Sequence, residues 1–118
     1  MGEVDSAALE AACERYVSLV GDEDVDSLMD LFAPDCRVED PVGSPVREGH
    51  DAVREFYATL PAAGVSARLC GPVHTVPDAR AAAFPFEIDT AGMVMQVIDV
   101  MTFDEEGKIT SMTAYWNM

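Results

Sequence analysis

Apolar and polar positions alternate with the period of an amphipathic helix in three segments of the first half of the chain. The predicted helices span residues 6–20, 25–32 and 49–61. Asp5 or Ser6 can cap the first helix and Gly21 can end it, because residues of these types are favoured at those positions. Pro34 and Pro61 would end the other two helices, since proline cannot continue a helical hydrogen-bond pattern.

The pattern becomes that of β-strands after the third helix. Predicted strands cover "CRVEDPV" (36–42) and residues 66–76, 80–89, 93–103 and 109–117, with "DEEGK" (104–108) as a hairpin loop. Helices followed by strands favour an α+β domain, with three N-terminal helices packed on a strongly curved, mostly antiparallel sheet. Such a sheet forms a cone with an apolar pocket, and residues 1–118 are expected to make a single domain of this kind.

Composition and charge disfavour several classes of function. Apolar residues make up 49% of the chain, which indicates a folded globule rather than a disordered segment. The net charge of −15 repels phosphate, so nucleic acid and anionic membranes are poor partners. The amino terminus does not resemble a signal peptide and no stretch reaches membrane-spanning length, so we expect no membrane insertion. Cysteines that we expect to be reduced favour a cytoplasmic protein.

The cysteine and histidine spacings do not predict a metal site or a cofactor. Cys13, Cys36 and Cys70 are odd in number, form no CxxC and have apolar neighbours, so we expect reduced core residues. His50 and His74 are far apart and belong to no metal-ligand motif. Because glycine-rich phosphate loops are also absent from the sequence, we expect no cofactor.

One predicted strand segment, "VMQVIDVMTF" (94–103), carries a single acid, Asp99, among apolar side chains. Side chains alternate between the two faces of a strand, so Asp99 shares a face with Met95, Val97 and Met101. Ionising a lone carboxylate there would cost several kcal/mol or more. A buried arginine partner or a place at the sheet rim would be an ordinary explanation. The alternative is that burial raises the pKa of Asp99 until the acid stays protonated and can donate a hydrogen bond.

Three further polar side chains would project into the same pocket. Tyr16 and Tyr57 lie on the apolar faces of predicted helices, and Asp40 ends the strand that leads into "DPVG". Taken alone, each has an ordinary explanation, because core tyrosines often bond a backbone carbonyl and Asp-Pro often starts a turn. Taken together with Asp99, they would bring neutral hydrogen-bond donors into an apolar pocket, where donors can stabilise oxyanion charge.

The segments "RYVSLV", "RVEDPVG", "REFY", "VIDVMTFDEEGKI" and "AYW", in this order and spacing, resemble bacterial ketosteroid isomerase (steroid Δ-isomerase) of the nuclear transport factor 2-like fold. The resemblance covers about residues 8–117, and "VEDPVG" and "VIDVM" are its most specific parts. It implies that Asp40 is the general base and that Tyr16 and Asp99 form the oxyanion hole. It also implies that Asp99 stays protonated in apolar surroundings, a behaviour for which this enzyme is itself the standard example.

The implied reaction converts 3-oxo-Δ5-steroids into conjugated 3-oxo-Δ4-steroids by intramolecular proton transfer through a dienolate, as part of steroid and lipid metabolism and with no cofactor. The resemblance also implies that Tyr57 hydrogen-bonds Tyr16, that the Trp116 indole N–H helps to hold the base, and that the chain forms a homodimer. Phe32 stands where some relatives have a further tyrosine. Because phenylalanine cannot donate a hydrogen bond, the network of tyrosine hydroxyls at Tyr16 and Tyr57 is shorter here than in those relatives. The apolar residues expected to contact a steroid are Val20, Phe56, Phe86, Val97, Met101, Met112 and Trp116.

Two other functions stay open at this point. A different enzyme of the same fold, such as a polyketide cyclase or dehydratase, would use an Asp or His base on another ligand, but such enzymes usually differ at the position of Tyr16 or Asp99. A non-catalytic domain that binds apolar ligands would have no use for a deeply buried acid. Changing Asp99 in such a domain would stabilise it without loss of function.

Overall fold

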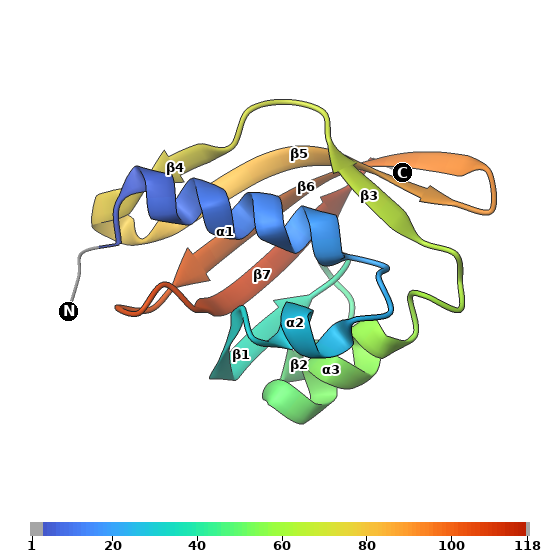
Figure 1. Ribbon diagram of the computed structural model, residues 1–118, viewed down its shortest axis with the longest axis horizontal. Coiled ribbons are helices and arrows are strands. Elements are labelled where there is room, and N and C mark those ends of the chain that lie inside the picture. Colours follow the sequence, from blue (N-terminus) through green and yellow to red (C-terminus); the bar gives the residue numbers. More distant parts are fainter. Residues whose placement is uncertain (1–3, 118) are drawn as a thin grey trace.

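The first helix begins and ends where the sequence predicts. The computed structural model describes residues 4–117 (Figure 1), and its helix α1 spans Ser6–Leu19. The Asp5 carboxylate caps the helix by accepting a hydrogen bond from the Ala8 N–H at 2.9 Å. Gly21 turns the chain just past the helix with a φ of +82°, a conformation that favours glycine. The buried face of the helix consists of Leu9, Cys13, Tyr16, Val17 and Leu19.

Within residues 4–117, seven strands form one open, mixed sheet. They are β1 Phe32–Glu39, β2 Arg47–Glu48, β3 Ser66–Leu69, β4 His74–Val76, β5 Ala81–Thr90, β6 Met93–Phe103 and β7 Ile109–Trp116. Their order is β2-β1-β7-β6-β5-β3, and β4 also pairs with β5. β1 and β7 are parallel, while the other pairs are antiparallel, so the α+β class and the mostly antiparallel sheet agree with the sequence.

The second helix, α2, is shorter than predicted. It spans Val25–Met29, and Phe32, expected at its end, instead begins β1. Pro34 lies inside β1, where the register with β7 is interrupted and resumes at Arg37. Proline is tolerated at such an irregularity because it has no N–H to give to the ladder. A short apolar run fits either a buried helix or a buried strand, and this one is a strand.

The predicted strand over 66–76 is two strands, β3 and β4, in the structure. Between them lies Gly71-Pro72, and a Cβ at Gly71 would come within 2.7 Å of the Pro85 side chain on β5. Pro72 cannot donate to a ladder, so the chain leaves the edge of the sheet there and returns with β4. The two-residue strand β2 is too short for a hydrophobic pattern and is not predicted from the sequence.

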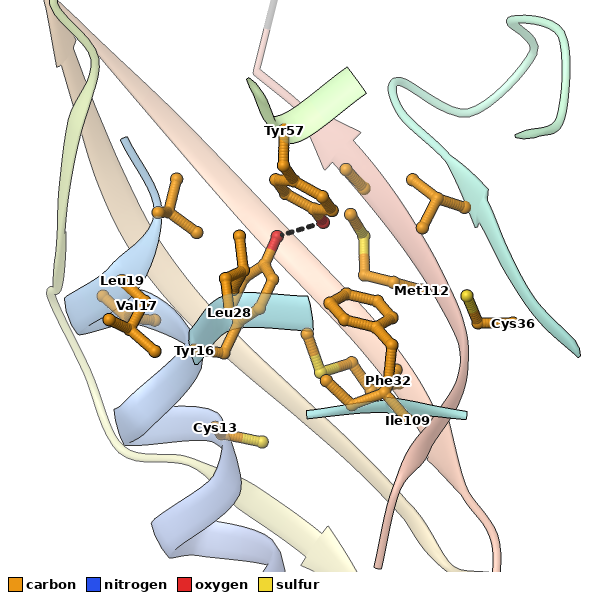
Figure 2. Close-up of a cluster of buried hydrophobic side chains, with 14 of the residues drawn as sticks. Cys13, Tyr16, Val17, Leu19, Leu28, Phe32, Cys36, Tyr57, Ile109 and Met112 are labelled. Atoms are coloured by element: carbon orange, nitrogen blue, oxygen red, sulfur yellow. Dashed lines mark hydrogen bonds between the residues drawn. The ribbon is translucent and has the colours of Figure 1, made fainter. Parts of the chain in front are cut away.

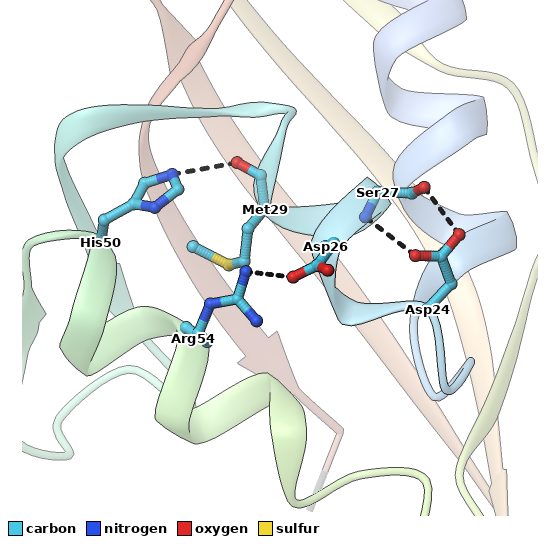
Figure 3. A network of polar contacts seen from close by, with 6 residues as sticks. All are labelled: Asp24, Asp26, Ser27, Met29, His50 and Arg54. Carbon is cyan, nitrogen blue, oxygen red and sulfur yellow. Dashed lines mark hydrogen bonds and ion pairs between the residues drawn. The ribbon is translucent and has the colours of Figure 1, made fainter.

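The third helix, α3, spans His50–Ala58 and ends about one turn earlier than predicted. A polar network joins it to α2 (Figure 3): the His50 ring shares a hydrogen bond of 3.0 Å with the Met29 carbonyl, and the Arg54 guanidinium donates to the Asp26 carboxylate. These contacts tie the two short helices together beside β1 and β2 and thereby fix the direction in which α3 presents its buried face.

The core lies between the helices and one face of the sheet. α1 lies beside β3, β4 and β5, whereas α2 and α3 lie at the β1–β2 end of the sheet (Figure 1). Along β6 the alternation follows the sequence prediction, with Val97, Asp99 and Met101 buried and with Ile98 and Val100 exposed on the opposite face.

The cysteine prediction holds for two residues of three. Cys13 and Cys36 are buried, but Cys70 is exposed, because it lies in the segment that leaves the sheet edge after β3. The expectation that Cys70 is a core residue is therefore wrong. In the described part of the chain, no helix is both long and apolar enough to cross a membrane.

Candidate active site

An apolar cavity of about 190 Å³ lies between the helices and the inner face of the sheet. Its wall includes side chains from α1, α3, β5, β6 and β7. A mostly apolar wall with a few polar groups is the usual form of a small-molecule site. The lining residues are Tyr16, Val20, Asp40, Phe56, Tyr57, Leu60, Val65, Phe86, Ile88, Thr90, Met95, Val97 and Trp116.

The cavity includes most of the apolar residues expected to contact a ligand. The expected residues that line it are Val20, Phe56, Phe86, Val97 and Trp116. Met101 and Met112 do not line it. They pair across β6 and β7 and are buried in the core, because the cavity extends toward the Met95 end of β6 and away from Met101.

Five lining residues are not predicted from the sequence, namely Leu60, Val65, Ile88, Thr90 and Met95. The strand period could have found two of them. Ile88 and Met95 are register partners, and each lies two residues along its strand from an expected lining residue, Phe86 and Val97. Leu60 follows Phe56 by four residues, a helical spacing that could also have found it, whereas Val65 belongs to the connection between α3 and β3.

α1 and α3 bring two phenol groups together at the cavity (Figure 2). The hydroxyl oxygens of Tyr16 and Tyr57 are 2.7 Å apart in a buried hydrogen bond, in which either hydroxyl can be the donor. Burial raises the pKa of both phenols well above the usual value, and their mutual interaction and the charge of Asp99 add to this for Tyr16. Both hydroxyls therefore keep their protons at neutral pH and remain hydrogen-bond donors.

The Phe32 ring packs against this hydroxyl pair but adds no polar group to it. Its centroid lies 6.3 Å from that of Tyr16 and 5.6 Å from that of Tyr57. Phe84 contacts Tyr16 from the sheet at 6.1 Å. Tilted and edge-on aromatic contacts of this kind are favourable and pack the two tyrosine rings against their neighbours.

Asp99 is fully buried on β6, and neither of its carboxyl oxygens has a hydrogen-bond partner among the described residues. Burial, and then the charge of Asp40, raise the pKa of Asp99 well above its usual value, while the nearby Tyr16 hydroxyl opposes the shift. A raised pKa favours the protonated form of the acid, and in that form Asp99 has one O–H donor. Its side chain does not line the cavity itself, whereas that of Tyr16 does.

Asp40 lines the cavity directly after the end of β1. Its Oδ1 accepts a hydrogen bond of 2.8 Å from the indole N–H of Trp116 on β7. Burial raises the pKa of Asp40, and the Trp116 hydrogen bond and the charge of Arg47 partly offset this. A carboxylate with a raised pKa is a stronger base than an exposed one, which suits it to proton abstraction.

The chemistry available to these groups is that of an acid–base pair in an apolar enclosure. The cavity wall carries the Asp40 carboxylate and neutral phenol donors, and the buried acid Asp99 lies next to Tyr16 outside the lining. A carboxylate and neutral donors can remove a proton next to a carbonyl group and stabilise the resulting oxyanion. Among residues 4–117 there is no group of three or more His, Cys, Asp or Glu side chains placed to hold a metal ion.

The chain belongs to the SnoaL-like domain family, whose pattern matches residues 13–112. Over 115 residues it is 44% identical to the steroid Delta-isomerase of Nocardioides simplex, an alignment that covers 94% of this chain and 91% of the relative. This level of identity over nearly the full length of both proteins supports an isomerase and agrees with the resemblance found in the sequence motifs.

Two more distant relatives have other chemistry in their names. The solved structure of SalBIII, described as an epoxide hydrolase/cyclase-like enzyme in pyran ring formation in salinomycin, superimposes with a TM-score of 0.84 at 30% identity and covers 97% of this chain and 94% of its own. Epoxide hydrolase LasB of Streptomyces lasalocidi is 29% identical over 82% of this chain, which spans 43% of that protein. The SalBIII structure shares the fold described above.

Proposed function

We propose that this protein is a steroid Δ-isomerase that moves a carbon–carbon double bond of a 3-oxo-Δ5-steroid into conjugation with the ketone. The observation that carries the proposal is Asp99, a fully buried acid with two unpartnered carboxyl oxygens beside the Tyr16–Tyr57 hydroxyl pair. Packing alone does not explain such an acid, since a buried polar group without a partner is destabilising. A role as proton donor to a charged oxygen does explain it. The similarity to the Nocardioides simplex isomerase supports the same reaction.

In the proposed mechanism Asp40 removes a proton from the carbon between the ketone and the alkene. The bonding electrons move onto the ketone oxygen, which gives a dienolate. Tyr16 and Asp99 donate hydrogen bonds to this oxygen, whose negative charge is larger in the transition state than in the ground state. Asp40, now protonated, returns the proton to the far end of the diene, so the same carboxyl group acts as base and then as acid.

The position of Asp40 suits a base that must reach two carbon atoms. It lies in the irregular segment between β1 and β2 and is held by one Trp116 hydrogen bond, whereas the proposed donors lie on the helix α1 and the strand β6. A loop carboxylate can move between neighbouring carbons, and donors on regular elements stay fixed where the oxygen must be held.

We also propose that the curved sheet and its helices enclose the ligand as a cone. The cavity of about 190 Å³ is smaller than the roughly 300–1,000 Å³ typical of drug-sized ligands. A steroid would therefore place its 3-oxo ring inside, near Asp40 and Tyr16, and its remaining rings toward the mouth, where Val65, Ile88 and Met95 provide apolar surface.

A homodimer packed through the outer face of the sheet is part of the proposal. That face exposes Val94, Ile98, Val100 and Tyr115 from β6 and β7. Contiguous apolar side chains on a sheet surface often mark an interface. A groove of about 370 Å³ on this side is lined by Cys70, Pro85, Gln96, Val97, Ile98, Tyr115, Trp116 and Asn117, so Val97 and Trp116 border both the groove and the inner cavity.

Ultraviolet absorbance on mixing the protein with 5-androstene-3,17-dione tests the proposal, because the conjugated enone product absorbs where the substrate does not. We expect a rapid rise in the wild type and a loss of at least about 100-fold in kcat for Asp40→Asn, the size of a general-base contribution. Steroid binding should survive in this variant, and Asp99→Leu should be slower than the wild type. A flat trace from folded wild-type protein, or ordinary turnover by Asp40→Asn, would contradict the assignment.

The similarity to SalBIII and LasB favours epoxide opening as the second candidate function. A protonated acid beside a carboxylate could also protonate an epoxide oxygen while the carboxylate directs the attacking hydroxyl group. Incubation with an apolar hydroxy-epoxide, followed by mass spectrometry for the cyclised or hydrated product, separates the two reactions. Product from the epoxide together with no enone from the steroid would favour this second function.

A further inference from the structure

Arg47 is a cation placed on the buried side of the sheet edge, close to Asp40. It stands in β2 opposite Val38 of β1, and directly opposed residues of an antiparallel pair point to the same face. Val38 is fully buried, so Arg47 projects toward the interior and is itself only partly exposed. Asp40 follows Val38 by two positions, which continues the same face just past the end of the strand.

The contacts of Arg47 differ from those of other arginines in the structure. Its guanidinium carbon lies 4.4 Å from the centroid of the Phe56 ring, and Phe56 and Asp40 both line the cavity. One terminal nitrogen, Nη1, is buried and has no hydrogen-bond partner among the described residues. By contrast, exposed arginines such as Arg37 and Arg68 form ion pairs with glutamates.

A buried guanidinium nitrogen without a partner is destabilising unless other groups compensate the charge. The face of an aromatic ring attracts a cation, and Phe56 supplies that attraction. The second compensating group is Asp40, since the charge of Arg47 lowers the pKa of Asp40 against the effect of burial. The ring therefore holds the cation at a place where its charge acts on the cavity.

The other groups around Asp40 cannot supply this charge. Asp99 from β6, Tyr16 from α1 and Tyr57 from α3 all have raised pKa values and are neutral when Asp40 is ionised. Trp116 from β7 donates a hydrogen bond but carries no charge. Arg47 is therefore the cationic side chain that acts on the Asp40 carboxylate in the described part of the chain.

We propose that Arg47 is a positioning residue for the base: its guanidinium, held over the Phe56 ring, keeps the Asp40 carboxylate ionised in apolar surroundings and extends the active form of the enzyme to lower pH. The kinetic part of this inference rests on the proposed isomerase function. The electrostatic coupling between Arg47 and Asp40 does not, and it can be measured without any substrate.

The chain offers a built-in reporter for that measurement. It contains one tryptophan, and the indole N–H of Trp116 donates directly to Asp40. The single indole resonance in a proton–nitrogen NMR spectrum should therefore shift as Asp40 gains or loses its proton. Asp40→Asn is the control for assignment, because it should abolish this titration step.

We expect the midpoint of the indole titration to move to higher pH in Arg47→Met and Arg47→Gln and to stay near that of the wild type in Arg47→Lys, which keeps the charge. The matched control is Arg37→Met, since the Arg37 side chain is 57% exposed and pairs with Glu48 at 3.9 Å. Should one neutral variant fail to fold, the other gives the same comparison. A midpoint unchanged in the neutral variants, or raised as much by lysine as by methionine, would overturn the inference.

The pH dependence of kcat/KM for the steroid then tests the kinetic consequence. The acid limb should move to higher pH in Arg47→Met, in step with the indole midpoint. If the indole midpoint shifts as expected while the wild type has no isomerase activity, the proposed function is wrong and the coupling stands. If the wild type is active and the midpoints of all variants coincide, the function stands and the role of Arg47 is wrong.

Discussion

Asp99 is the residue at which stability and the proposed function conflict most directly. It is fully buried, both carboxyl oxygens lack partners among the described residues, and its pKa is raised first by burial and then by Asp40. A side chain of the same shape without an ionisable proton would keep buried polar atoms there, but its folding would not depend on a proton that the unfolded chain loses. The acid therefore makes a testable contribution to the pH dependence of folding.

We expect Asp99→Asn to be more stable than the wild type, with a difference that grows as the pH rises. An unfolded aspartate loses its proton near a pKa of about 3.9, whereas folded Asp99 keeps its proton well above that value. Between these two pKa values the free energy of unfolding of the wild type falls by about 1.4 kcal/mol for each pH unit of increase. An asparagine at this position contributes no such dependence.

Urea unfolding of both proteins at several values between about pH 4 and pH 7 measures this difference in the free energy of unfolding. Asp35→Asn, which changes an exposed acid on β1, is the matched control. A difference between Asp99→Asn and the wild type that stays constant across this range would show that Asp99 ionises normally in the folded protein.

At the scale of elements, the end of α1 depends on one close contact. Gly21 has a φ of +82°, and a Cβ placed there would lie 1.8 Å from the carbonyl oxygen of Val65. Val20, which precedes Gly21, and Val65 itself both line the cavity. The approach of the two backbones thus sets the distance between α1 and the segment that enters β3.

Gly21→Ala should destabilise the protein well beyond the cost of the backbone conformation alone. Gly107 has a similar φ of +81°, and a Cβ placed there would meet nothing within 4 Å, so Gly107→Ala isolates the conformational cost of about 1–2 kcal/mol. The backbone overlap at Gly21 should add roughly 1–3 kcal/mol more. Thermal or urea unfolding measures both changes, and equal losses in the two variants would mean that the contact with Val65 is unimportant.

The elements differ in how well the sequence alone predicts them, for identifiable reasons. α1, β5, β6 and β7 have long periodic patterns and lie within a few residues of the prediction. Phe32 is predicted in the wrong element because a short apolar run has no decisive period, and β2 is not predicted because two residues have none at all. These errors concern segments whose conformation is decided by tertiary pairing.

The candidate site is predictable only in part. Tyr16, Asp40, Tyr57 and Trp116 line one cavity, and the hydrogen bonds of Tyr16 with Tyr57 and of Trp116 with Asp40 are present. Their grouping comes from the resemblance to a known family, since no local pattern relates residues so far apart in sequence. No sequence pattern identifies Arg47 as part of the site, because its place there depends on the contact with the Phe56 ring and on the register between β1 and β2.

The whole molecule combines a strongly acidic charge with an apolar outer sheet face. The net charge is −15, and Val94, Ile98, Val100 and Tyr115 are exposed on β6 and β7. Burial of these side chains would favour the proposed homodimer, and repulsion between two acidic copies would oppose it. The balance between these effects depends on ionic strength, because salt screens only the repulsion.

We expect dimerisation to strengthen between about 20 mM and about 300 mM sodium chloride, over which the screening length falls to a few ångströms. Sedimentation equilibrium at the two salt concentrations measures the association constant. Ile98→Glu adds a charge to the apolar face and should yield monomers at both concentrations, whereas Glu105→Gln in the hairpin loop away from that face should behave as the wild type. An association that weakens with salt would contradict an interface of apolar side chains.

Val97 and Trp116 belong to the wall of both the inner cavity and the outer groove. Molecules bound on the two sides would touch the same two residues, and Trp116 also holds Asp40 by its indole N–H. Thermodynamic linkage makes any effect across this wall reciprocal: if association of two copies tightens the binding of a ligand, the ligand tightens the association by the same factor. Ligand affinity in this protein is then a function of protein concentration.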